Sequence, residues 1–231
     1  MANRTPRRPQ CLTGADCAVV KGGPISGISF AGSFGAQSPA EGYMTVDYGA
    51  ARLNMVESQV RTNDVTDVAI HDAMRAVARE AFCPADKAFQ AYADVDVEYA
   101  PGRWLLKPRD VGKLLQALKP RAGEKALAVA APYAAAVLEH IGLDVTRVDA
   151  DLAGAAGQYD LIIVEGAVSA VPAAWLQALA PEGRLGAIER NGPVGRARIH
   201  LRGADDVGVV DAFDATPPVL AGFEAPAGFA F

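Results

Sequence analysis

The sequence is poor in the residues that mark several classes of protein. It has three cysteines and three histidines among 231 residues. Cys11, Cys17 and Cys83 follow neither a metal-binding spacing nor an even disulfide framework. This cysteine usage is typical of a reducing compartment and predicts a cytoplasmic protein. No apolar run approaches the roughly 18 residues of a membrane-spanning helix, so no membrane association is expected.

Excess basic charge is also lacking. The formal net charge is −5, and the isoelectric point is near 5.2. Nucleic acids and anionic membranes attract basic surfaces, so this balance argues against both as partners. Hydrophobic residues at 51% and charged residues at 21% are typical of an ordinary globular domain.

Periodicity is missing from residues 1–43, which are rich in Gly, Ser and Pro. Lys21 and a Gly-Pro cluster interrupt the weakly apolar stretch there, whereas a secretory signal needs about 7–15 continuous apolar residues. We predict that residues 1–43 are a disordered tail or a mis-assigned start, with Met44 as the native first residue. Residues 44–231 then form one α/β domain.

The centre of the chain has the pattern of a nucleotide-type α/β site. Apolar strands are predicted at 125–129, 144–148 and 161–164, with a helix at 133–141. In such sites an acidic residue at the end of the second strand accepts ribose hydroxyls, and Asp149 has that place. Glu165 follows the third strand at the carboxyl edge, where ligands gather. Both acids have an alternative reading as purely structural or solvated residues.

The glycine-rich turn expected after the first strand is absent. The turn reads Val129-Ala130-Ala131-Pro132. Glycines there let the backbone approach a ligand, whereas β-carbons and a proline ring fill that space.

Helices and strands flank this centre. A first helix is predicted from 47 to about 61, with Leu53, Val56 and Val60 inward, and a second is capped by Thr66 with Ala69 inward. The other predicted elements are a strand at 95–99, helices at 108–119 and 172–180, a strand at 184–189, an antiparallel pair at 196–202 and 207–212, and a docked apolar tail at 217–223.

This order of elements resembles the class I methyltransferases that use S-adenosylmethionine, and more specifically the protein-L-isoaspartate O-methyltransferase family. The resemblance covers roughly 45–223. It is carried by MVESQVR (55–61), AMRAVAREAFCP (73–84), YDLIIV with the later VP and LAPEGRL (159–185), and FDATPPVLAGF (213–223).

The resemblance implies a Rossmann-like sandwich, a parallel sheet with a C-terminal antiparallel strand pair. It implies methyl transfer from S-adenosyl-L-methionine to isoaspartyl carboxylates of damaged proteins, and hence a protein or peptide substrate. The candidate cofactor-binding residues are then Ala130 and Tyr133 in the turn, Asp149, and Glu165.

The departures from the family pattern fall on the chemistry. Leu106 stands where the family has a substrate-site serine, so no catalytic residue is assigned. Only nine residues, 150–158, separate Asp149 from Tyr159, and nine residues reach at most ~32 Å. The family's next helix, strand and adenine-contacting loop do not fit there.

We therefore predict a fold shortened by one helix and one strand, with an exposed sheet edge through which a homodimer forms. Two functional readings remain open. The chain is either an isoaspartyl methyltransferase of weak or lost activity, or a non-catalytic methyltransferase-like binding or structural module.

Overall fold

The computed structural model describes residues 47–149 and 151–225, so the predictions for residues 1–43 and Met44 lie outside the described part. The α-helices are α1 (Tyr48–Met55), α2 (Val68–Ala76), α3 (Pro108–Leu118), α4 (Pro132–Ile141) and α5 (Ala173–Gln177). The strands are β1 (Val97–Ala100), β2 (Arg103–Leu105), β3 (Lys125–Val129), β4 (Asp144–Val148), β5 (Tyr159–Val168), β6 (Leu179–Arg190), β7 (Gly195–Arg202) and β8 (Val207–Ala215). Short helical turns lie at Val56–Val60, Arg61–Asn63, Arg79–Phe82 and Ala88–Gln90.

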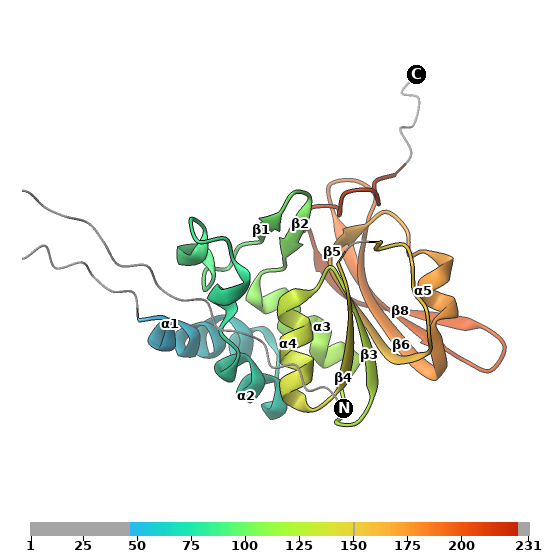
Figure 1. Ribbon diagram of the computed structural model, residues 1–231, viewed down its shortest axis with the longest axis horizontal. Helices are drawn as coiled ribbons and strands as arrows, with labels where there is room; N and C mark the ends of the chain where they lie inside the picture. The colour runs from blue at the N-terminus through green and yellow to red at the C-terminus, as the bar shows by residue number, and fades with distance from the viewer. Residues whose placement is uncertain (1–46, 150, 226–231) are drawn as a thin grey trace, which may run out of the picture. The chain divides into compact units, whose positions relative to one another are not determined.

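Six of these strands form one mixed sheet in the order β4-β3-β5-β6-β7-β8 (Figure 1). The first four run parallel, and β6, β7 and β8 pair antiparallel. The predicted parallel sheet with a C-terminal antiparallel pair is confirmed. Strands β4 and β8 are its two edges.

The connection from β4 to β5 is short, as predicted. Asp149 and residues 151–158 contain no helix and no strand. A single tight turn follows Asp151, in which the Gly154 N–H donates to the Asp151 carbonyl (3.1 Å). The sheet thus ends at β4, and the predicted shortening is confirmed.

Helices cover both faces of the sheet. On one face α3 and α4 pack against the strands, and α1 and α2 lie outside them (Figure 1). On the other face, Trp175 of α5 is fully buried and its indole N–H donates to the Leu152 carbonyl (2.8 Å). Along β3, the small side chains of Ala126 and Ala128 face the side of the sheet that α3 and α4 cover. Leu127 and Val129 face the side that α5 covers.

The N-terminal helices differ in detail from the prediction. Leu53 is 52% exposed, so its place in the core was wrong. Arg52 faces inward instead, because its guanidinium bonds the Tyr92 hydroxyl (2.9 Å) and the Glu80 carboxylate (3.2 Å). The predicted Val56 and Val60 are fully buried.

The second helix begins one residue later than predicted. Asp67, not Thr66, caps α2, and its carboxylate accepts from the Ala69 N–H (2.9 Å). Thr66 is instead held by the side chain of Gln116. Ala69 is exposed rather than buried.

The helix α5 is shorter than predicted. It ends at Gln177 because the chain already pairs with β5 from Ala178, whose carbonyl accepts from Tyr159 N (2.8 Å).

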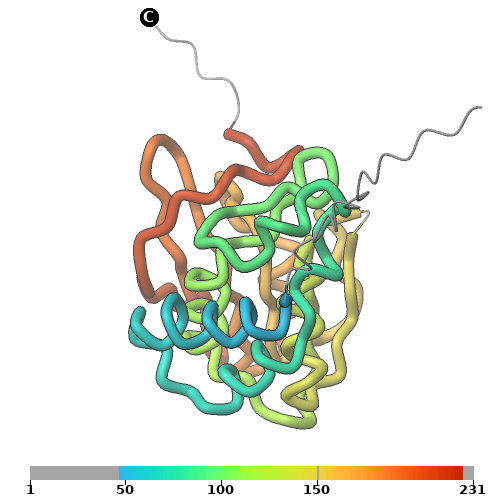
Figure 2. The backbone as a smooth tube through the Cα atoms, turned by 90° about the vertical axis from the view of Figure 1, so that its left-hand side faces the viewer, coloured from blue at the N-terminus to red at the C-terminus, as the bar shows by residue number. Residues whose placement is uncertain are grey.

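The apolar tail after β8 is docked, as predicted. Val219 bridges to Ala167 of β5, and Leu220 is fully buried. Ala221 donates its N–H to the Gly102 carbonyl (3.2 Å), so the tail lies beside the β1–β2 hairpin (Figure 2). Gly102 has φ +66°, and a β-carbon there would lie 2.5 Å from that of Ala221. Hairpin and tail together cover the carboxyl edge of β5.

Among the residues that the structure describes, no helix has the length and apolar character needed to cross a membrane.

Candidate functional site

The turn after β3 retains a glycine-type backbone without a glycine. Ala130 has φ +47°, a conformation that a β-carbon disfavours. Its N–H donates to the carbonyl of Val148 in β4 (2.9 Å), which holds the turn in place. Ala130 is fully buried and Ala131 is 1% exposed, so their methyl groups fill the space above the strand.

A bulge in β5 brings Glu165 to the same place. Ile163 pairs with Gly186 and Ala167 with Ile188, so three residues of β5, including Glu165, stand opposite Ala187 alone. Bulges bend a strand and re-aim side chains. Here the bulge turns Glu165 toward the N-terminus of α4.

The Glu165 carboxyl group is fully buried, and both of its oxygens lack a hydrogen-bond partner among the described residues. Removal from water raises its pKa to about 8. The charge of Arg79 opposes this shift, as do the N–H groups of Ala134 and Tyr133 in the first turn of α4. Those N–H groups lie close enough to act on the carboxylate without reaching full hydrogen-bond geometry. Glu165 is therefore a neutral acid at pH 7.

Arg79 completes this cluster and was missed from the sequence. It is fully buried and donates to the carbonyls of Ala91 and Leu106, each at 2.7 Å. Its guanidinium carbon lies 4.8 Å from the ring centre of Tyr133, a cation–π contact. Its Nη1 has no partner, and no ion pair with Glu165 forms within 4.0 Å among the described residues. The signal in the sequence that could have identified Arg79 is a charged side chain within the largely apolar segment 73–84.

Tyr133 is held by aromatic and cationic neighbours. It is the second residue of α4, it is fully buried, and its ring meets Phe82 edge-on at 6.0 Å. Burial raises the pKa of its hydroxyl, which has no partner among the described residues.

Tyr99 of β1 also lies near Glu165. Burial raises the pKa of its hydroxyl, and the nearby charges of Glu165 and Asp149 raise it further. Tyr99 is thus near enough to feel the charges of both predicted acids, a proximity that its sequence context did not reveal. We call Glu165, Arg79, Tyr133 and Tyr99 the buried cluster.

Asp149, unlike Glu165, is exposed to solvent. It directly follows the last residue of β4. Together with Asp151 and Gly154 it borders an open hollow of about 450 Å³ beyond the strand end. Asp149 keeps the place expected for a ribose-binding acid, but no strand of the described part of the chain lies beyond β4 to enclose that place.

Leu106 is fully buried, so its side chain is part of the core. Only its carbonyl reaches the buried cluster, through the bond from Arg79. This position supplies no reactive side-chain group.

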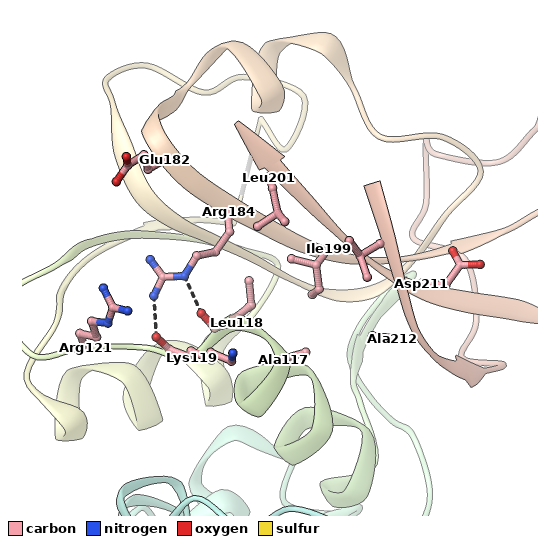
Figure 3. Close-up of a pocket in the computed structure, with 11 residues that line it drawn as sticks. Ala117, Leu118, Lys119, Arg121, Glu182, Arg184, Ile199, Leu201, Asp211 and Ala212 are labelled. Atoms are coloured by element: carbon pink, nitrogen blue, oxygen red, sulfur yellow. Dashed lines mark hydrogen bonds between the residues drawn. The ribbon is translucent and has the colours of Figure 1, made fainter. Parts of the chain in front are cut away.

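A separate hollow of about 450 Å³ lies at the amino end of the parallel strands, between the end of α3 and strands β6–β8 (Figure 3). Arg184 spans it and donates to the carbonyls of Leu118 (2.5 Å) and Lys119 (2.7 Å). The side chain of Arg184 therefore satisfies carbonyl groups at the C-terminal end of α3. Ligands in open α/β sheets bind at the opposite, carboxyl end.

Comparisons with known proteins agree with this architecture. No family model matches the chain. A protein-L-isoaspartate O-methyltransferase of Methylorubrum extorquens is 33% identical over 202 residues, which cover 74% of this chain and 88% of the relative. The enzyme of that name from Methylorubrum populi is 37% identical over 165 residues, 59% of this chain and 78% of the relative.

The fold is similar to that of a putative protein-L-isoaspartate O-methyltransferase from Plasmodium falciparum, solved in complex with S-adenosyl-L-homocysteine. The TM-score is 0.61 at 13% identity, over 76% of this chain and 99% of that one. Identity, coverage and fold agree, and the chain belongs to the protein-L-isoaspartate O-methyltransferase family.

Proposed function

We propose that this family member has lost S-adenosyl-L-methionine-dependent transfer of methyl groups to isoaspartyl carboxylates and serves as a non-catalytic methyltransferase-like module. One observation carries the proposal: the place where a ligand binds in such sheets is filled by the protein's own side chains. Ala130, Tyr133 and Glu165 have no exposed surface.

The residues at the carboxyl edge do not fit the cofactor of the family. A sulfonium cofactor needs backbone access at the turn after β3, and two alanine methyl groups and Pro132 occupy that turn. Glu165 fills the space before α4. Of the four candidate residues only Asp149 is exposed, and the hydrogen bonds of one exposed acid contribute little net binding energy for a ribose.

A methyl-transfer assay tests this proposal directly. We expect the full chain, incubated with labelled S-adenosyl-L-methionine and an isoaspartyl peptide, to transfer no label above the protein-free blank. The Methylorubrum extorquens relative, assayed in parallel, is the positive control. Turnover by this chain that depends on the isoaspartyl linkage, and is absent with the normal aspartyl peptide, would refute the proposal.

A module without catalysis acts through a surface, and we propose that the β4 edge pairs with a second copy. The N–H and carbonyl of Val148 face β3, because its carbonyl accepts from Ala130. Backbone groups alternate in direction along a strand, so those of Val145 and Arg147 face outward. No strand of the described residues pairs with these groups, which are therefore a template for strand addition.

We expect size-exclusion chromatography with light scattering to give a dimer that dissociates on dilution. Arg147→Pro removes an outward N–H and should favour the monomer. Arg147→Ala is the matched control, because it loses the same bond to Glu139 (2.7 Å) and keeps the N–H. A monomer at every concentration, or equal effects of the two substitutions, counts against pairing along β4.

The cysteine usage supports a cytoplasmic location, which we include in the proposal. The partners expected are proteins, either damaged chains or a second copy, rather than nucleic acid or membrane.

A further inference from the structure

The N-terminus of α4 has the geometry of a ligand site. Helix α4 begins at the turn after β3, and Ala131 provides no side chain to cap it. The first N–H groups of a helix need partners and carry partial positive charge, so they attract anionic or hydrogen-bonding groups. In open α/β sheets a ligand binds here.

A protein side chain is aimed into this site. Glu165 comes from the bulge in β5, is fully buried, and has two oxygens without a partner among the described residues. The nearest backbone donors are the N–H groups of Tyr133 and Ala134. The guanidinium of Arg79 is fixed by two main-chain carbonyls and by the Tyr133 ring, and its Nη1 has no partner among the residues that the structure describes.

We propose that Glu165 is a resident internal ligand, whose carboxyl group occupies the binding position at the N-terminus of α4 and closes it to exogenous molecules. This inference rests on the proposed function and states why the site is closed. The position accepts a carboxylic acid group, and Arg79, Tyr133 and Tyr99 form its walls. It should therefore accept a small carboxylic acid once Glu165 is shortened.

The group that a Glu165→Ala substitution removes closely matches a small carboxylic acid. The change from Glu165 to alanine removes a CH₂–COOH group, which corresponds to one molecule of acetic acid. Engineered cavities in protein cores admit small molecules of the shape removed. Acetate should thus restore stability that the substitution removes.

The experiment is a thermal unfolding titration of the full-length Glu165→Ala variant with sodium acetate, against sodium chloride at equal ionic strength. At about pH 5, where a substantial fraction of an exposed carboxylic acid is still protonated, we expect acetate to raise Tm by several degrees, since a ligand that binds only the native state stabilises it. Wild type and Glu165→Gln, whose amide fills the space, should show no acetate-specific rise. A folded Glu165→Ala variant without that rise, or an equal rise in Glu165→Gln, overturns the proposal.

A second measurement needs no truncated variant. The backbone amide resonances of Tyr133 and Ala134 in the wild-type chain should shift together as Glu165 titrates, with a midpoint near 8. The groups that face Glu165 are Arg79, Asp96, Tyr133, Tyr99 and Cys83. The Glu165→Gln variant should abolish the shift, and amides that do not respond overturn the proposal. Failure of the proposed function has another signature, methyl transfer by the wild-type chain.

Discussion

Replacing Arg79 with methionine should destabilise the domain by about 2–6 kcal/mol, because two buried carbonyl groups lose their donor at about 1–3 kcal/mol each. The methionine fills much of the same volume but leaves the carbonyls of Ala91 and Leu106 buried without a donor. It also leaves Tyr133 without its cation. Urea unfolding at neutral pH measures the change in the free energy of unfolding.

Arg75→Met is the matched control, because it makes the same substitution four residues earlier. Arg75 is one-third exposed and bonds only the side chains of Glu57 and Asp72. Surface pairs of this kind contribute at most about 1 kcal/mol. If Arg79→Met were no more destabilising than Arg75→Met, Arg79 would not organise the buried cluster.

The second large effect concerns Glu165: its ionisation should make the wild-type protein less stable as the pH rises. The pKa of Glu165 is about 8 in the folded chain and near 4.5 when exposed. Between these values the unfolded chain releases the proton and the folded chain keeps it, so the unfolded state is favoured as pH rises. The contribution is fully present below about pH 4.5 and is lost by about pH 8, with a total of about 5 kcal/mol.

Glu165→Gln isolates this contribution, because the amide has nearly the same shape and does not titrate. We expect the free energy of unfolding of the variant, minus that of wild type, to increase steadily from about pH 5 to pH 8. Burial also raises the pKa of Tyr99, Tyr133 and Cys83, which keeps these groups neutral over the same range. Parallel pH profiles of variant and wild type would show that Glu165 ionises freely in the native state.

Much of the fold follows from local rules. Pro108 and Pro132 begin α3 and α4, Gly142 ends α4 in the left-handed conformation, and the apolar runs of β3 and β5 lie where both sheet faces are covered. The errors are of two kinds. Leu53 was placed in the core because apolar spacing takes no account of Arg52, and Thr66 was chosen as a cap although Gln116, fifty positions away, holds it.

The strand pattern placed Asp149 and Glu165 at the carboxyl edge, and the family resemblance added Ala130 and Tyr133 as candidates. That Glu165 is buried depends on a bulge, whose register is set by pairing with β6 and is not visible in the β5 sequence.

Arg79 and Tyr99 come from segments distant in the chain and join the cluster only through tertiary packing. No spacing rule relates them to Glu165.

The most direct test of the account is calorimetric titration of S-adenosyl-L-methionine and S-adenosyl-L-homocysteine into the wild-type chain. A site filled by Ala130, Tyr133 and Glu165 predicts no heat of binding even at millimolar ligand. Binding of micromolar strength, about −8 kcal/mol, would contradict it and show that the cluster opens to admit the cofactor.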